Sequence, residues 1–255
     1  MKNLTVIIPV YDLNTEEKQT LFIEAVNSVD DSNILVVAPE EDIKAITKLK
    51  IDKNIRMISN TTTNTSYPAQ VNIGVKEVKT EYFSILEYDD RFSSIWFKNA
   101  ETYIENDVEN TFMFLPLTEV IDVNYGPIGY ANEAVWASSF SDEIGYYDMQ
   151  CLEDYIDFCT SGAIIKTEDF INLGMLKSSM KLTFWYEFML RAAYKGKRMF
   201  VIPKVGYYHT IGREYSLSTF YTNNLSEAEG NWWFDTAKKE YFFPHDRNKT
   251  YQAEE

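Results

Sequence analysis

The sequence contains few of the residues that mark several large classes of protein. Its only cysteines, Cys151 and Cys159, are eight residues apart and form neither a CxxC pair nor part of a disulfide framework, so we expect free thiols. No apolar run approaches the ~18 residues that a membrane-spanning helix needs. The apolar N-terminal run, LTVIIP, is too short for a signal-peptide core. We therefore expect a cytoplasmic protein without membrane insertion.

Basic residues are also scarce, and their distribution is uneven. The chain has 24 Lys and Arg against 39 Asp and Glu, a net charge of −15, which argues against non-specific binding to nucleic acid or anionic membranes. Residues 99–165 have 13 acidic side chains and no basic one, whereas residues 166–217 have nine basic and four acidic ones. The acidic stretch is either a solvated insertion or a rim that repels anions or binds a polar acceptor molecule. The basic segment leaves the binding of an anionic molecule open.

Apolar residues are abundant and follow a regular pattern. Hydrophobic residues make up 45% of the 255 positions, enough for a sizeable core. The first part alternates apolar runs typical of buried strands with amphipathic helical segments, namely strands at 4–9, 34–38 and 55–59 and helices at 15–28 and 40–49. This alternation predicts an α/β fold with a mostly parallel sheet, whose ligand site lies at the carboxyl ends of the strands.

Three carboxylates follow the next predicted strand, residues 82–86. Glu87, Asp89 and Asp90 would leave the carboxyl edge of the sheet together. Their mutual repulsion is tolerated where a cation offsets it, and oxygen ligands suit Mg²⁺ or Mn²⁺ with the phosphates of a nucleotide diphosphate. The simpler alternative is a group of acids at the tip of a surface turn.

The remaining elements divide the chain into four parts. We predict a helix at 68–79, a hairpin within 111–140, a strand at 160–166, a helix at 183–195, strands at 198–203 and 206–209, and a helix near 227–240. The parts are residues 1–98, the acidic segment 99–159, residues 160–217 and a C-terminal helical tail, residues 218–255.

Several segments together resemble the family-2 glycosyltransferases with the GT-A fold. The nucleotide-binding half of that family is similar to LTVIIPVYDLN and PAQVNIGVKEVKTEYFSILEYDDRF, and its acceptor half to TSGAIIKTEDFINLGML, WYEFMLRAAYKGKRMFVIPKVGYYH and REYSLS. The resemblance covers about residues 4–100 and 160–218. It implies that residues 1–98 are a nucleotide-sugar-binding half, residues 99–159 an acidic insertion or acceptor rim, and residues 160–217 an acceptor half of the same domain. It implies metal-dependent transfer of a sugar from a nucleotide-diphosphate donor, such as a UDP-sugar, to a hydroxyl of a glycan or polysaccharide.

The resemblance also implies roles for individual residues. The base of the donor nucleotide would lie against Pro9, Val10 and Tyr11, and its ribose would contact Glu87. Asp89 and His209 would bind the metal, and Asp90 would support them in the catalytic centre. A loop with Arg213 and Ser216 would close over the diphosphate. For His209, the alternative is a hydrogen-bonded core histidine.

The sequence departs from the family at three positions. Glu40 is the first acid after strand 34–38, but Ala38 and Pro39 precede it, which puts base recognition in doubt. Both Glu40 and Asn72 are expected at the nucleotide, but Asn72 follows Val71 where relatives have an Arg-Asn pair, which removes a cationic contact. The carboxylate that serves as general base falls at Phe184-Trp185, which leaves Glu187 as the nearest candidate. Glu187 could instead pair with Arg191 at i+4, and a retaining mechanism or a base from the acidic insertion, Asp154 or Asp157, is also open.

The acceptor is less well defined than the donor. Trp185 and Trp136 have faces that stack on sugars and on flipped-out bases. The Lys-, Asn- and Tyr-rich composition is similar to that of phage-encoded members that glycosylate modified, hydroxymethylated DNA bases, so modified DNA is an alternative acceptor. A second alternative is a non-catalytic nucleotide- or sugar-binding module. An oxidoreductase is disfavoured because no G-x-G-x-x-G follows Pro9. Donor sugar, stereochemistry and oligomeric state stay open.

Overall fold

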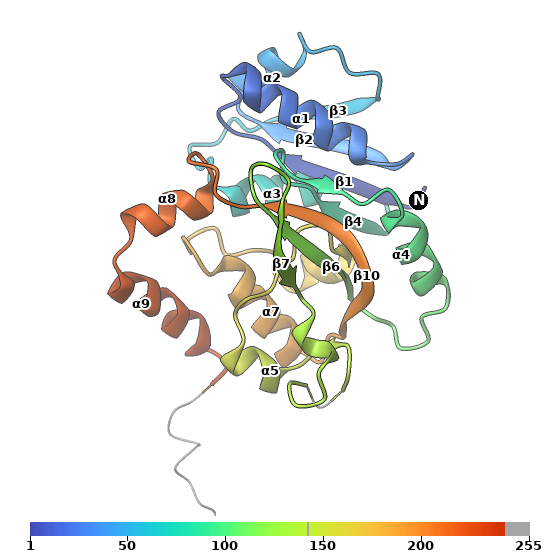
Figure 1. The fold of residues 1–255 in the computed structure, drawn as a ribbon, viewed down its shortest axis with the longest axis vertical. Helices are drawn as coiled ribbons and strands as arrows, with labels where there is room; N and C mark the ends of the chain where they lie inside the picture. Colours follow the sequence, from blue (N-terminus) through green and yellow to red (C-terminus); the bar gives the residue numbers. More distant parts are fainter. Residues whose placement is uncertain (142, 243–255) are drawn as a thin grey trace, which may run out of the picture.

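Strands and helices alternate along the first third of the chain, as the sequence predicts. The computed structural model describes residues 1–141 and 143–242 (Figure 1). The alternating elements are β1 (Leu4–Pro9), α1 (Glu16–Ser28), β2 (Asn33–Ala38), α2 (Glu40–Ile46), β3 (Ile55–Ser59), α3 (Tyr67–Glu77) and β4 (Tyr82–Ile85). α1 begins where expected because the Thr15 side chain accepts a hydrogen bond from the Lys18 amide and two acids occupy the first turn.

The second part of the chain completes the sheet and its helical layers. Its strands are β5 (Arg91–Phe92), β6 (Met113–Ile121), β7 (Pro127–Ala131), β8 (Tyr146–Tyr147), β9 (Ile164–Lys166) and β10 (Met199–Thr210). Its helices are α4 (Trp96–Glu105), the 3₁₀ turn η1 (Ala134–Trp136), α5 (Met149–Asp154), α6 (Thr167–Asn172), α7 (Phe184–Tyr194), α8 (Leu217–Asn224) and α9 (Glu227–Lys238). The predicted helix near 227–240 is confirmed, and residues 243–255 of the predicted tail lie outside the described residues.

All these strands belong to one sheet with the order β3-β2-β1-β4-β9-β6-β10-β5, and β7 and β8 pair with β6 and β10. β3, β2, β1 and β4 are parallel. β9 is antiparallel to both β4 and β6, and β10 is parallel to β6. β10 therefore has the same direction as β4, and the carboxyl ends of β1, β4 and β10 lie at one edge of the sheet.

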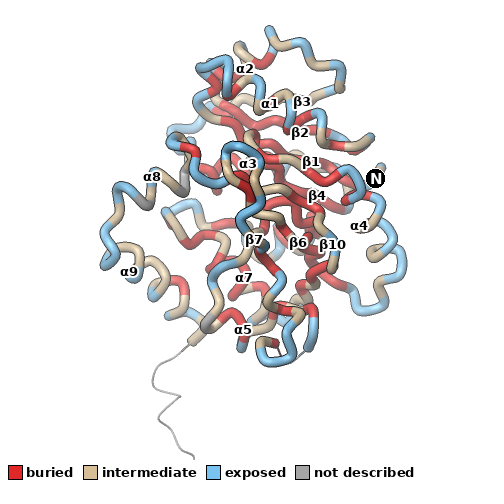
Figure 2. The backbone as a smooth tube through the Cα atoms, viewed as in Figure 1, coloured by how far each residue is buried: buried red, intermediate tan, exposed pale blue. Residues whose placement is uncertain are grey.

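The sheet is buried on both faces, as the continuous apolar strands predict (Figure 2). On β1, Ile7 packs into one core cluster with residues of α3, α6 and α7. Val6 and Ile8 pack into the other cluster with residues of α1 and α4. The predicted α/β fold is confirmed.

Residues 99–159, expected as an insertion, contribute to the sheet itself. β6 lies between β9 and β10, β7 pairs with β6, and β8 pairs with β10. The same segment contains η1, α5 and most of α4. The acidic stretch therefore supplies a central strand as well as surface.

The two predicted strands 198–203 and 206–209 form one strand, β10, with irregular pairing to β6 between Ile202 and Tyr207. Gly206 lies within this irregular segment, and a Cβ there would collide with the Trp96 ring, so glycine lets Trp96 pack closely on the strand. The irregular segment changes the register of the end of β10, which includes His209. In the described part of the chain, no helix combines the length and apolar character needed to cross a membrane.

Candidate functional site

The acidic loop, residues 87–90, is held firmly at the carboxyl end of β4. The Leu86 amide donates to the Ile7 carbonyl at 3.0 Å, and the Asp90 amide closes a turn onto the Glu87 carbonyl at 3.1 Å. The Glu87 amide donates to the Tyr207 hydroxyl on β10 at 3.1 Å. A backbone hydrogen bond to β1 and a hydrogen bond to a side chain of β10 thus fix the loop.

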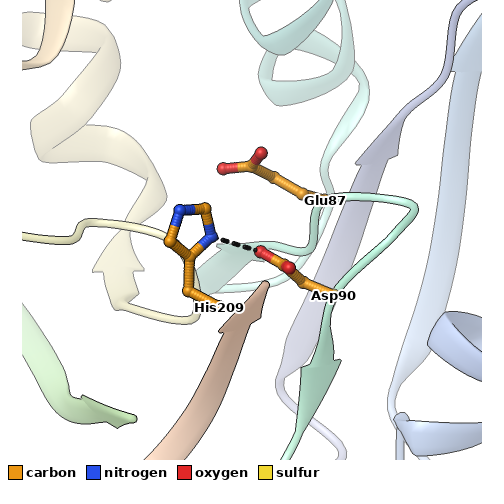
Figure 3. Close-up of side chains that lie close together, drawn as sticks. All are labelled: Glu87, Asp90 and His209. Carbon is orange, nitrogen blue, oxygen red and sulfur yellow. Dashed lines mark hydrogen bonds and ion pairs between the residues drawn. The ribbon is translucent and has the colours of Figure 1, made fainter. Parts of the chain in front are cut away.

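Asp90 and His209 form the centre of the site (Figure 3). The Oδ2 atom of Asp90 lies 2.8 Å from Nδ1 of His209, and the Thr210 amide donates to Oδ1 of Asp90 at 2.8 Å. The Asp90 side chain is only 1% exposed, so it is not at the tip of a surface turn. Burial lowers the pKa of His209, but the charge and hydrogen bond of Asp90 outweigh it and hold that pKa well above its usual range.

Glu87, at the beginning of the acidic loop, extends toward the imidazole of His209 (Figure 3). The Ser161 hydroxyl donates to its Oε1 at 2.7 Å. Burial and the nearby charge of Asp90 raise the pKa of the Glu87 carboxyl. Glu87, Asp90 and His209 each offer one ligand atom, and these atoms lie within 4.8 Å of one another.

This carboxylate–histidine cluster, Glu87, Asp90 and His209, fits a divalent cation. Carboxylate oxygen and imidazole nitrogen are donors that Mn²⁺ accepts, and Mg²⁺ prefers the oxygens. Because Asp90 bonds Nδ1 of His209, the other ring nitrogen is left for a ligand role, which is the common arrangement around metal-bound histidines.

Asp89, which the resemblance implied as a metal ligand, lies outside the cluster. Its carboxylate Oδ2 is 3.2 Å from Nη1 of Arg213, which also donates to the Asp89 carbonyl at 2.6 Å. Burial and the charges of Asp90 and Glu87 raise the pKa of Asp89 to about 7, although Arg213 opposes this. Arg213, expected at the diphosphate, is thus buried against the acidic loop.

A pocket of about 420 Å³ opens beside the cluster, within the size range of small-molecule sites. Of the residues singled out from the sequence, Tyr11, Glu87, Trp185 and His209 line it. Phe184, at the place of the expected base, lines it as well. The lining residues that the sequence did not indicate are Tyr67, Leu182, Tyr221, Leu225, Ser226, Glu227 and Gly230.

Pro9, Val10, Glu40, Asn72 and Ser216 do not line this pocket. Pro9 and Val10 are buried directly before Tyr11. Exposed Glu40 pairs with Lys44 at 2.7 Å. The Asn72 side chain donates to the Leu176 carbonyl at 2.8 Å and accepts from the Leu176 amide at 3.1 Å, and the Ser216 side chain caps α8. Asn72 and Ser216 therefore have structural hydrogen bonds.

The suggested base Glu187 is also placed elsewhere. It is 1% exposed and does not line the pocket. Its carboxylate is 2.7 Å from Arg191 and 2.9 Å from Lys177, and the Tyr241 hydroxyl donates to it at 2.7 Å. The i+4 pairing with Arg191, left open from the sequence, is present. With both oxygens held in this network, Glu187 is not available to an acceptor in the pocket.

The other acceptor and base candidates are dispersed. The Trp136 ring packs on Phe200 with centroids 5.8 Å apart, near the beginning of β10 and thus at the opposite end of that strand from His209. Asp157 is exposed and does not line the pocket, and the side chain of Asp154 lies outside the described residues.

Ser161 is a site residue that sequence reasoning did not single out. The Thr-Ser-Gly segment before β9 belongs to a turn, in which the Gly162 amide donates to the Ile85 carbonyl at 2.8 Å. Gly162 has φ +80°, and a Cβ there would lie 2.5 Å from Cδ2 of Tyr207. A glycine directly after a serine was the only signal, and it is weak on its own.

The overall structure is similar to solved structures of TarS from S. aureus, a glycosyltransferase of the GT-A type. The match to TarS 1-349 has a TM-score of 0.60 and 17% identity and covers 100% of this chain and 76% of that one. The complex of TarS 1-349 with UDP-GlcNAc gives a TM-score of 0.63 and 17% identity over 94% of this chain and 73% of that one. The match to a longer TarS structure has a TM-score of 0.61 and 16% identity and covers 100% of this chain and 46% of that one.

No protein-family model and no curated protein matches the sequence. The structural similarity shows that the fold is of the GT-A type, as the resemblance implied.

Proposed function

We propose that this protein is a metal-dependent glycosyltransferase that moves a sugar from a nucleotide-diphosphate donor to an acceptor hydroxyl. The observation that carries the proposal is the carboxylate–histidine cluster at the carboxyl edge of β4 and β10, beside a pocket into which Glu87 and His209 face. TarS structures hold UDP and UDP-GlcNAc, which supports a UDP-sugar as the donor here.

The residues of the site have separable roles in this proposal. Glu87 and His209 would hold a divalent cation, Mn²⁺ or Mg²⁺, with Asp90 orienting the imidazole or acting as the third ligand. When bound, the cation supplies Lewis-acid stabilisation of the charge on a leaving diphosphate. The rings of Tyr11 and Trp185 provide faces for the base or sugar of the donor.

The lining of the pocket favours a neutral acceptor. Among the described residues that line it, none is Lys or Arg, and two are glutamates. A DNA backbone needs cationic contacts, so we propose a glycan-type hydroxyl rather than modified DNA.

A binding module without catalysis is the second candidate, and one observation favours it. Phe184 and Trp185 occupy the place of the expected carboxylate, and Glu187 is held in ion pairs away from the pocket. Such a protein would bind a nucleotide sugar without releasing the nucleotide.

Two measurements test these proposals. Calorimetry with UDP, with and without Mn²⁺, should show metal-dependent binding. The His209→Ala variant should bind UDP more weakly. The control variant Glu101→Gln, changed on the exposed face of α4, should bind UDP as the unchanged protein does. The absence of binding to any nucleotide diphosphate would refute the donor site. Release of UDP from UDP-sugars then separates an enzyme from a binding module.

A further inference from the structure

The C-terminal helices form one wall of the pocket. Tyr221 of α8 and Ser226, Glu227 and Gly230 at the beginning of α9 line it, together with Glu87 and His209. Figure 1 shows α8 and α9 along one side of the protein, and α9 packs against α7. This wall comes from a segment in which the sequence indicated no site residue apart from Ser216.

α9 is anchored to the protein in its middle and beyond its end. Its first turn is capped by its own Ser226, whose side chain accepts from the Glu229 amide at 3.2 Å. In its middle, the Thr183 hydroxyl donates to the Trp233 carbonyl at 3.1 Å, and beyond its end Lys177 pairs with Glu240 at 2.6 Å. The helix that holds Glu227 is therefore packed on the body of the protein, and the exposed Glu227 side chain lines the pocket from its first turn.

Glu227 is the one carboxylate among the described lining residues that other groups do not engage. The other lining carboxylate, Glu87, accepts from Ser161 and belongs to the carboxylate–histidine cluster. The Glu227 carboxylate has no ion-pair or hydrogen-bond partner among the described residues. It lies in the first turn of α9, where the helix dipole favours a negative charge.

We propose that Glu227 is the general base of the transfer reaction, a role that rests on the glycosyltransferase function proposed above. Its carboxylate takes the proton of the acceptor hydroxyl while the hydroxyl oxygen forms a bond to the anomeric carbon of the donor sugar. The bond from that carbon to the diphosphate oxygen breaks, and the nucleoside diphosphate leaves with the electron pair. A carboxylate from α9 thus replaces the one that is absent at Phe184 and Trp185.

The test uses water as the acceptor, because any hydroxyl that enters the pocket meets the same base. UDP release is measured from UDP-GlcNAc, UDP-glucose and UDP-galactose with Mn²⁺, and UDP affinity is measured by calorimetry. Glu227→Gln should lower turnover about 10²-fold or more, the usual range for a general base, and leave the Kd for UDP within about twofold. Glu227→Asp, which keeps the carboxylate, should retain part of the activity.

Glu229→Gln is the matched control. Glu229 lies in the same turn but pairs with Lys181 at 3.8 Å, so its loss should leave turnover near that of the unchanged protein. If the Glu227→Gln variant kept full turnover, the assignment of Glu227 as the base would be overturned, and the transferase proposal would stand. The same conclusion would follow if that variant lost as much UDP affinity as turnover. Unchanged protein that releases no UDP from any donor would overturn the transferase and the base together.

Discussion

Asp90 and His209 lie 119 residues apart in the chain, yet their side chains share a hydrogen bond of 2.8 Å between Oδ2 and Nδ1. The neighbouring Thr210 amide binds the other oxygen of the same carboxylate at 2.8 Å. A carboxylate held at two points fixes both the tautomer and the direction of the imidazole. The link joins the ends of β4 and β10, the two strands that build the proposed metal site.

Asp90→Asn should therefore weaken metal binding without unfolding the protein. An Asn amide can donate to Nδ1 of His209, which would move the ring proton to the nitrogen that faces the metal position. We expect Mn²⁺ affinity to fall about 10- to 100-fold, the usual cost of losing such an orienting partner. Titration calorimetry with Mn²⁺ measures this, with thermal melting as a check on folding. Unchanged Mn²⁺ affinity would show that Asp90 neither orients nor ligates.

The sequence predicted much of the fold because apolar periodicity is a local signal. The run from Leu4 to Pro9 places apolar side chains on both faces of a strand, which predicts burial of both faces, and it forms the buried strand β1. The position of β6 was missed because pairing between β9 and β10 is a long-range property. Acidic composition around that strand indicated a surface insertion, although residues 113–116 are fully apolar and buried.

The acidic loop was predicted because it directly follows a buried strand, which is also a local signal. The separate contacts of its three carboxylates were not predicted. The order of residues 87–90 does not say which carboxylate faces His209 and which faces Arg213, since that depends on the turn closed by the Asp90 amide. Glu227 was missed because nothing near it in the sequence resembles a site, and only the packing of α9 on α7 brings it to the pocket.

The two tryptophans suggested for the acceptor should behave differently when replaced. Trp185 lines the pocket, so Trp185→Ala should weaken UDP-sugar binding about tenfold, as expected for the loss of an aromatic face. Trp136 packs on Phe200, so Trp136→Ala should cost about 3 kcal/mol of stability and leave that affinity unchanged. Calorimetry and urea unfolding of both variants measure the difference. Equal losses of affinity would contradict the placement of Trp136 away from the site.

Glu187 should prove structural. Glu187→Gln removes a buried charge that Arg191 and Lys177 share, and we expect a loss of roughly 3 kcal/mol in the free energy of unfolding. Tyr241→Phe removes only one hydrogen bond to the same carboxylate and should cost about 1 kcal/mol. Urea unfolding gives both values. If Glu187→Gln were as stable as the unchanged protein but transferred no sugar, Glu187 would be the base after all.

The Cys151 thiol should be nearly inert in the folded protein. Burial raises its pKa to about 12, so at pH 8 only about one thiol in 10⁴ is the reactive thiolate. In a Cys159→Ser variant, which leaves Cys151 alone, labelling with a disulfide reagent at pH 8 should be at least about 100-fold slower than in guanidinium. Above the ordinary cysteine pKa of about 8.5, the unfolded state releases a proton that the folded state keeps. The contribution of this protonated thiol to stability is therefore complete below that pH. It is lost as the pH rises toward 12. Rapid stoichiometric labelling of the folded variant would show that the site around Cys151 opens to solvent.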